Sequence, residues 1–310
     1  MMDRDAVCVL LPAYEESETV GTVVADFREA GFDDVLVVDG GSTDGTRAVA
    51  REEGARVEIQ SGQGKGQAIR EAVREYVDKP YVLLADADCT YQVEDAEAML
   101  EPLFSGEAEH VIGNRYGNIH EDAMTRFNDL GNSIFNWLFR VINGEDFVDI
   151  LSGYRAFTVE SFERLQLRAD GFGIETEMSV ECARHSIPVT VVPITYMPRP
   201  DGSSTKLHPL KDGWIILAAL YRKAKTSNPL FYFGTVGVVS GVAGAGIEAF
   251  VAYDWFVNRT PHEVLAFAGG TLIILGIQFL IFAVLSDLVV TLHNELLDRI
   301  ETVEDRLPDE

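Results

Sequence analysis

The stretch LLADADCTY, residues 83–91, places two carboxylates, Asp86 and Asp88, directly after an apolar run. In an extended segment, residues i and i+2 point to the same side, so these carboxylates would converge on one spot. Two close carboxylates repel each other unless a cation lies between them, and Mg²⁺ and Mn²⁺ prefer such oxygen ligands. The stretch therefore predicts a metal site at a strand end, with two ordinary surface acids as the alternative.

A second stretch, VVDGGSTDGT at residues 37–46, has a similar form. Asp39 ends an apolar run, and the two glycines that follow would let a ligand approach the backbone. Ser42, Asp44 and Gly45 would form a turn that caps the next helix. Taken alone, the stretch is explained equally well as an ordinary turn and helix cap.

The elements that would position these acids alternate regularly between residues 6 and 115. Strands are predicted at 6–12, 34–40, 55–60, 81–86 and 110–115, and helices at 16–31, 44–54, 64–77 and 93–104. Strict alternation of strand and helix predicts right-handed crossovers and a mainly parallel sheet. Ligands of such sheets bind beyond the carboxyl ends of the strands, where Pro12, Asp39 and Asp86 all fall.

Between residues 116 and 200 the pattern is mixed. One helical stripe of apolar side chains comprises Phe127, Leu130, Ile134, Phe135, Leu138, Val141 and Ile142. The stripe is most simply part of the core, and a helix that lies against a membrane surface is the alternative. Residues 189–200 predict a strand that is ended by prolines.

The last third of the chain contains two long apolar segments. Residues 230–247 carry no charge, and residues 264–286 give 23 further uncharged positions. At about 1.5 Å per residue the second segment can span a bilayer, and the first can do so if it continues towards Trp255. We therefore expect a transmembrane hairpin, with a buried helical core as the alternative. Gly237, Gly241 and Ala245 would let two helices approach closely, within the hairpin or between two copies of the chain.

Basic residues predict how this hairpin is oriented. Arg222, Lys223 and Lys225 precede the first span, whereas the turn at 257–263 carries one Arg and one Glu. The positive-inside rule then places both ends of the hairpin, and with them both termini, on the cytoplasmic side of the cell membrane. The apolar run near the N-terminus is about seven residues long, which is short for a signal peptide.

Composition excludes several classes of function. The chain has 50 acidic against 25 basic residues, a formal charge of −25, yet 47% of its residues are hydrophobic. Such an acidic but foldable chain is typical of a halophile, whose salt screens the self-repulsion. The charge argues against nucleic acid as a partner.

The three cysteines lie far apart and form no zinc motif or disulfide framework. No G-x-G-x-x-G follows the first strand, and no P-loop is present.

Four stretches in order, LPAYEE (11–16), VVDGGSTDGT, GQGKGQA (62–68) and LLADADCTY, resemble the family 2 glycosyltransferases of the GT-A fold. The resemblance covers residues 6–205 and implies an α/β fold with a Rossmann-like, mainly parallel sheet flanked by helices. It also implies a nucleotide-sugar donor and Mg²⁺ or Mn²⁺ as cofactor. Together with the charge, it suggests a haloarchaeal source.

The resemblance assigns roles to matching positions. It implies a donor or nucleotide site made of Pro12, Tyr14, Glu16, Asp39, Lys65, Asp86, Ala87, Asp88, Thr90 and Arg115. Asp86 and Asp88 match the D-x-D that holds the metal and the donor diphosphate, and Thr90 stands where many members have Gln. Two departures, Glu15 for Asn and Gly40 for Asp, leave the nucleotide open between UDP and GDP.

Three later stretches resemble the branch of polyprenyl-phosphate transferases typified by dolichol-phosphate mannose synthases. In DILSGYRAF (149–157) the matching residues are Asp149, Ser152, Gly153 and Arg155, and in GFGIETEM (171–178) they are Glu175 and Glu177. In RPDGSSTKLHPLKDG (199–213) Arg199, Ser204 and Lys206 match the phosphate-binding positions of the acceptor loop. The alternatives are a solvated loop for Arg199 and Lys206, and a charge pair at a helix start for the two glutamates.

The resemblance and the hairpin together predict a function. We expect inverting transfer of a hexose, glucose or mannose, from a UDP- or GDP-sugar to dolichyl (polyprenyl) phosphate on the cytoplasmic membrane face. This step would begin lipid-linked glycan assembly for protein N-glycosylation. The expected catalytic residues are Asp88, Asp149, Arg199 and Lys206. A transferase that acts on a hydroxyl, with Asp149 as its base, and a silent nucleotide-sugar-binding scaffold are the alternatives.

The expected organisation has four parts. Residues 1–207 would form the GT-A catalytic domain with its acceptor loop, 208–228 a juxtamembrane amphipathic helix, 229–292 the transmembrane hairpin and 293–310 an acidic cytoplasmic tail.

Overall fold

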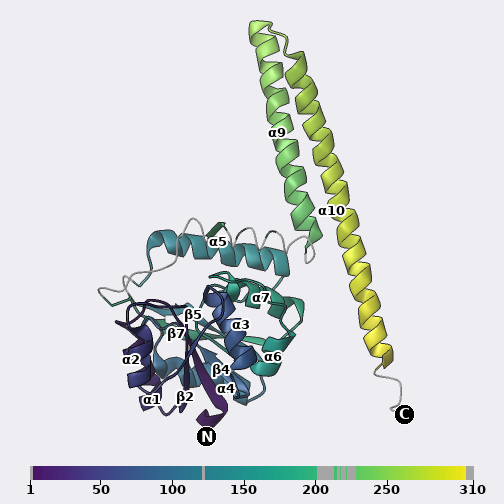
Figure 1. The fold of residues 1–310 in the computed structure, drawn as a ribbon. Helices are drawn as coiled ribbons and strands as arrows, with labels where there is room; N and C mark the ends of the chain where they lie inside the picture. Colours follow the sequence, from purple (N-terminus) through teal and green to yellow (C-terminus); the bar gives the residue numbers. More distant parts are fainter. Residues whose placement is uncertain are drawn as a thin grey trace. The chain divides into compact units, whose positions relative to one another are not determined.

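A seven-stranded sheet forms the centre of the first part of the chain in the computed structural model (Figure 1). The structure describes residues 3–120, 123–200, 213, 214, 217, 221 and 228–304. It divides into two units, residues 1–220 and 221–310. The strands are β1 (Val7–Ala13), β2 (Asp34–Asp39), β3 (Arg56–Ile59), β4 (Tyr81–Leu84), β5 (His110–Ile119), β6 (Arg155–Thr158) and β7 (Val189–Tyr196).

The strand order is β3-β2-β1-β4-β6-β5-β7. The four N-terminal strands are mutually parallel, as predicted, and Ala13 at the end of β1 lies opposite Asp39 at the end of β2. The exception is β6, which pairs antiparallel with both β4 and β5. No strand is predicted at Arg155–Thr158 from the sequence, because four residues are too few to show a periodic pattern.

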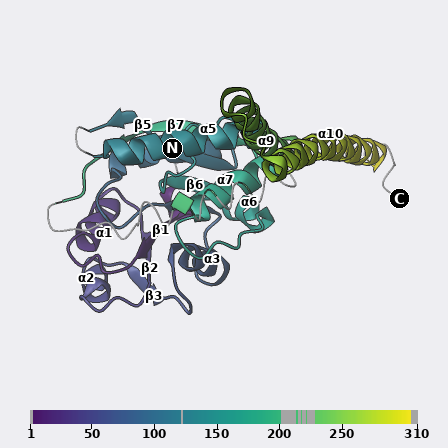
Figure 2. The ribbon, with the colours of Figure 1, turned by 90° about the horizontal axis from the view of Figure 1, so that it is seen from above.

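Helices cover both faces of this sheet. They are α1 (Val20–Glu29), α2 (Thr46–Glu52), α3 (Lys65–Glu75), α4 (Ala96–Phe104), α5 (Arg126–Asn143), α6 (Val159–Arg164) and α7 (Ile174–Arg184), with short 3-10 turns at Arg4–Ala6 and Val93–Asp95. Alternate residues of β1 share a buried cluster with Phe27 of α1 and Met99 of α4. α3, whose Ile69 is buried, contacts β1 and β2 and covers the opposite face (Figure 2). The expected α/β class with a mainly parallel sheet is confirmed.

Helix α5 has two apolar faces. It begins at Thr125, whose side chain accepts a hydrogen bond from the backbone N of Asn128 (3.2 Å), and ends at Gly144. Phe139 and Ile142 are buried. A second set, spaced as one helical side, is exposed: Leu130, Ile134, Trp137 and Val141. The apolar stripe is therefore core on one side only.

The second unit is a helical hairpin of α9 (Pro229–Asn258) and α10 (Glu263–Glu304). Two segments, Pro229–Asn258 and Glu263–Leu292, are long and apolar enough to cross a membrane, with mean hydropathies of 1.6 and 2.5. α10 continues through most of the predicted acidic tail. The predicted amphipathic helix at 208–228 falls mostly outside the described residues.

Small residues bring the two helices of the hairpin together. A Cβ at Gly237 would lie 2.8 Å from the carbonyl oxygen of Gly276, and a Cβ at Gly244 would lie 2.6 Å from that of Gly269. The hydroxyl of Ser240 donates to the carbonyl of Leu272 at 2.9 Å. Of the predicted row, Gly237 and Gly241 are thus used within one chain, since a Cβ at Gly276 would lie 2.8 Å from the backbone N of Gly241, whereas Ala245 is exposed. The predicted homo-oligomer through the hairpin has no support.

We predict that Gly244→Leu destabilises the hairpin by about 1–3 kcal/mol, because a side chain there must separate the helices. Gly246→Leu is the matched control, since a Cβ at Gly246 meets nothing within 4 Å. Thermal unfolding followed by circular dichroism in detergent would measure the difference. Equal melting temperatures for the two variants would contradict this packing.

Candidate active site

A cavity of about 600 Å³ lies at the carboxyl ends of β1, β2 and β4. The predicted residues that line it are Pro12, Tyr14, Glu16, Lys65, Asp86, Ala87, Asp88, Arg115 and Arg199. They come from five separate parts of the sequence, which the parallel strands bring to one edge. Helix α5 adds Asn128, Asn132 and Phe135 to the cavity wall.

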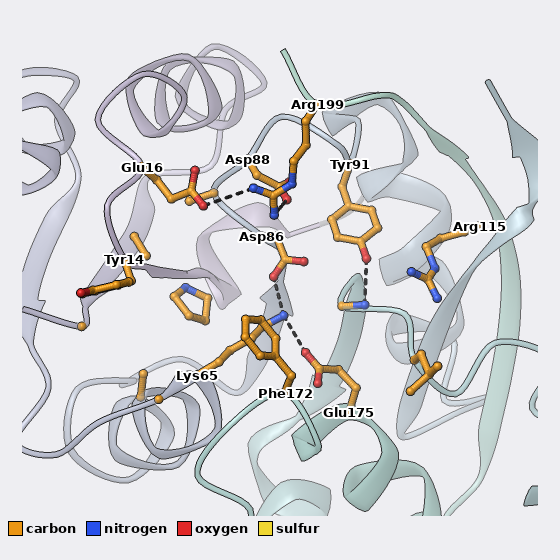
Figure 3. A pocket seen from close by; sticks show the side chains of 18 of the residues that line it. Tyr14, Glu16, Lys65, Asp86, Asp88, Tyr91, Arg115, Phe172, Glu175 and Arg199 are labelled. Atoms are coloured by element: carbon orange, nitrogen blue, oxygen red, sulfur yellow. Dashed lines mark hydrogen bonds and ion pairs between the residues drawn. The ribbon is translucent and has the colours of Figure 1, made fainter. Parts of the chain in front are cut away.

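Lys65 lies between two carboxylates (Figure 3). Its ammonium group contacts Oδ1 of Asp86 and lies 2.6 Å from Oε1 of Glu175. Burial alone would lower the pKa of Lys65, but the carboxylates of Asp86 and Glu175 outweigh burial and raise it above its usual value. The lysine therefore stays charged and fixes the position of Asp86.

Gly153 makes this arrangement sterically possible. A Cβ at this position would lie 2.8 Å from Oδ2 of Asp86 and 3.0 Å from Nζ of Lys65. The backbone N of Gly153 donates to the hydroxyl of Tyr91 at 2.8 Å, which holds the loop 149–154 against the cavity. Glycine is needed here for close approach and not for an unusual φ.

Asp88 is buried, with 3% of its surface exposed, and is paired with Arg199. Its Oδ2 lies 2.5 Å from Nη2 of Arg199, whose Nη1 is 3.4 Å from Oε1 of Glu16 (Figure 3). Its Oδ1 accepts from the backbone N of Thr90 (3.1 Å) and from the Thr90 hydroxyl (2.6 Å). Burial, and then the neighbouring Asp86, raises the pKa of Asp88 against the opposing effect of Arg199. Thr90 thus orients Asp88 and does not line the cavity.

The donor atoms fit a hard divalent ion. The carboxylates of Asp86 and Asp88 both border the cavity, although the described residues contain no group of three or more His, Cys, Asp or Glu side chains that could hold a metal. Mg²⁺ is commonly held by one or two carboxylates together with substrate phosphates, so two are enough. Four carboxylates, Glu16, Asp86, Asp88 and Glu175, stand against the two cations Lys65 and Arg199. A divalent ion would offset this negative excess.

Two buried polar atoms near the end of β2 lack partners within the described ranges. They are Oδ1 of Asp39 and Nε2 of Gln60. The other oxygen of Asp39, Oδ2, accepts from the backbone N atoms of Gly41 and Ser42, each at 3.0 Å. Gln60 lines the cavity, as do the two neighbours of Asp39, Val38 and Gly40. Unpaired buried polar atoms are costly, so this acceptor and donor suit a polar ligand.

Asp149 lies behind the cavity wall. It is fully buried, and its two oxygens accept from Nε (2.8 Å) and Nη2 (2.7 Å) of Arg115. Burial would lower the pKa of Arg115, but Asp149 raises it well above the usual value. The Arg115 guanidinium also lies over the ring of Tyr196, 5.5 Å from its centroid. Asp149 therefore positions Arg115, and this placement does not support the expected role as a base.

Two further predicted ligand residues lie away from the cavity. Arg155 is fully buried and donates to the carbonyls of Ile150 (2.8 Å) and Ser152 (3.0 Å) and to the Ser179 hydroxyl (2.9 Å). The side chain of Glu177 accepts from the backbone N atoms of Arg168 and Ala169 at 2.8 and 2.7 Å. Both hold loops in place, so a direct ligand contact is not supported for either.

The remaining predicted residues, Ser204 and Lys206, lie outside the described residues. The sequence prediction also missed lining residues. Tyr91, Gln60, Phe172 and Tyr196 line the cavity. Tyr91 and Phe172 lie inside motif stretches in which other residues were assigned the roles, and Gln60 and Tyr196 lie in predicted strands. Glu175, which the resemblance had paired with Glu177, is the member of that pair that reaches the cavity.

Comparison with known proteins gives consistent matches. The family model described as glycosyl transferase family 2 matches residues 8–165. Glycosyltransferase AglJ of Haloferax volcanii is 56% identical over 98% of this chain and 100% of its own length. Dolichyl-phosphate hexose transferase of the same organism is 33% identical over 67% of this chain and 90% of its own length.

A solved structure shares the fold. Glucosyl-3-phosphoglycerate synthase from Mycobacterium tuberculosis, in complex with Mn²⁺, UDP-glucose and phosphoglyceric acid, superimposes with a TM-score of 0.60 at 22% identity. The match covers 71% of this chain and 79% of the synthase.

We predict that Arg155→Met lowers the free energy of unfolding by about 3–5 kcal/mol, because it leaves two carbonyls and a hydroxyl buried without their donor. Chemical denaturation followed by tryptophan fluorescence would measure this loss. The folded fraction should keep its Mn²⁺ affinity. A variant with unchanged stability but weakened ligand binding would instead indicate a ligand contact.

We also predict that Gly153→Ala weakens Mn²⁺ binding by about tenfold, because the new methyl group must displace Asp86 or Lys65. The control is Gly171→Ala, where a Cβ meets nothing within 4 Å. Titration of Mn²⁺ by electron paramagnetic resonance would measure both affinities. If Gly153→Ala binds the ion as the control does, the close contact with Asp86 has no bearing on the metal site.

Proposed function

Because the chain belongs to glycosyltransferase family 2, we propose that it transfers a hexose from a nucleotide sugar to dolichyl or polyprenyl phosphate. The observation that carries the proposal is the cavity in which Asp86, Asp88, Lys65 and Arg199 meet at the strand ends. A dolichyl-phosphate hexose transferase is among the relatives that match two thirds of this chain. The sugar, glucose or mannose, stays open.

The unpaired atoms near β2 favour a uridine nucleotide. Uracil presents one N–H donor between two carbonyl acceptors, which complements Oδ1 of Asp39 and Nε2 of Gln60. Guanine presents two adjacent N–H donors, and a carboxylate that binds both would accept one hydrogen bond on each of its two oxygens. Oδ2 of Asp39 is already engaged by the turn. We therefore propose UDP in place of GDP.

Asp86 and Asp88 would hold Mg²⁺ or Mn²⁺ together with the donor diphosphate. The ion would stabilise the charge that develops on the departing nucleoside diphosphate. A phosphate oxygen of the acceptor would form the new bond to C1 of the sugar as the bond from C1 to the diphosphate breaks, with inversion. Arg199, with Lys206 from the predicted acceptor loop, would orient the acceptor phosphate by charge-assisted hydrogen bonds.

A phosphate acceptor needs no strong base, because it is already anionic. This requirement agrees with the position of Asp149, whose two oxygens are occupied by Arg115. A hydroxyl acceptor would need a base, and the candidate named for it is not available. The placement of Asp149 therefore favours the phosphate acceptor over the hydroxyl.

Two features support a lipid as the carrier of that phosphate. The hairpin has two helices long and apolar enough to cross a membrane. Helix α5 lines the cavity with one side and exposes Leu130, Ile134 and Trp137 on another. We propose that the catalytic unit and both termini face the cytoplasm, from the basic residues before the first span, and that the product enters glycan assembly for protein N-glycosylation.

We predict that the purified protein, in detergent and high salt with Mn²⁺ and dolichyl phosphate, converts labelled UDP-hexose but not GDP-hexose into a lipid-extractable sugar. Mild acid should release that sugar, because a sugar phosphate bond is labile. Asp88→Asn should lower turnover by about a hundredfold or more, since the carboxylate is lost from the metal site.

The panel of donors also separates the alternatives. An acid-stable product would indicate a hydroxyl acceptor, and transfer from GDP-hexose alone would contradict the base site at Asp39. No product with any donor would contradict the proposed transfer and favour a scaffold.

A further inference from the structure

Both oxygens of Asp88 are engaged by the protein. Oδ1 accepts two hydrogen bonds from Thr90, at 3.1 and 2.6 Å, and Oδ2 lies 2.5 Å from Nη2 of Arg199. The bonds to Thr90 are local and hold the carboxylate in its orientation. A metal ion that uses Asp88 must therefore take Oδ2, the oxygen that Arg199 occupies.

Asp86 differs from Asp88 in this respect. Its Oδ1 contacts Lys65, whereas Oδ2 accepts no hydrogen bond from any residue that the structure describes. Lys65 comes from the first turn of α3 and is held a second time by Glu175 at 2.6 Å. A metal ion can bind Oδ2 of Asp86 without moving Lys65, so the exchange of cations concerns Arg199 alone.

Arg199 lines the cavity, and its side chain is partly exposed. It follows the end of β7 by three residues and begins the predicted acceptor loop. Its contact with Glu16 is long, at 3.4 Å, and its side chain is 28% exposed. A guanidinium binds carboxylate and phosphate oxygens through the same planar set of donors, so it can pass from one to the other without desolvation of a new group.

The geometry points to Arg199 as an internal cation that occupies the metal-facing oxygen of Asp88 until a divalent ion displaces it. Once displaced, the guanidinium becomes available for the phosphate of the acceptor. This inference rests on the proposed function and adds a coupling to it: the ion that binds Asp88 frees the group that would hold the acceptor phosphate. A single side chain would then couple occupancy of the donor site to acceptor binding.

The test is Mn²⁺ binding without nucleotide or lipid, measured from the free-ion signal in electron paramagnetic resonance. Arg199→Gln should bind Mn²⁺ about tenfold more tightly than the wild type, because the competing cation is gone. Arg199→Lys keeps the charge but loses the planar fork, so its affinity should fall between the two. The control Arg140→Gln removes the same charge from an exposed arginine, paired with Asp146, and should leave the affinity unchanged.

Asp88→Asn separates this inference from the proposed function. In that background the further change Arg199→Gln should have no effect on Mn²⁺ affinity, because the shared oxygen is no longer a carboxylate. Wild-type affinity in Arg199→Gln, together with weakened binding in Asp88→Asn, would overturn the displacement and leave the proposed metal site standing. Wild-type affinity in Asp88→Asn would overturn the metal site itself. Circular dichroism confirms the fold of each variant.

Discussion

The structure depends on the pairing of buried carboxylates with cations at one edge of the sheet. Glu16, Asp88 and Glu175 are mostly withdrawn from water, and a charge in that state is costly unless it is paired and hydrogen-bonded. Lys65 forms ion pairs with Asp86 and Glu175, and Arg199 forms ion pairs with Glu16 and Asp88. Behind them, Arg115 is paired with Asp149. The cavity is thus assembled as a set of ion pairs, with the sheet as the frame that brings them together.

This constraint explains which parts of the site could be predicted from the sequence. Parallel strands end at a common edge, so strand-end residues such as Asp39 and Asp86 meet wherever the alternation of strand and helix is clear. The sequence also predicted Lys65, Arg115 and Arg199 near these acids, through resemblance to a family. The metal role of Asp86 and Asp88 stays a prediction.

Other residues could not be placed without the structure. Glu175 and Glu177 stand two positions apart in the first turn of a helix, so they point to different sides, and only the packing of α7 decides that Glu175 faces Lys65. Asp149 belongs to a loop, and Arg155 begins the short antiparallel strand β6. Neither segment has a periodic sequence pattern from which its position could be predicted. A charged residue in a motif can either contact the ligand or hold other parts of the site in place. Its burial in the structure shows which of these two roles it can have.

The rest of the chain agrees with an enzyme that works at a membrane in a salt-rich cell. The excess of acids matches the Haloferax volcanii origin of its relatives, and α5 and the hairpin both present apolar side chains outside any core. A crystal structure with Mn²⁺ and UDP, in which anomalous scattering locates the ion, tests most directly whether Asp86 and Asp88 form a metal site from which Arg199 is displaced. We predict that Asp86 and Asp88 hold the ion and that the Arg199 guanidinium is withdrawn from Asp88. An ion located elsewhere, with Arg199 still paired to Asp88, would contradict the account.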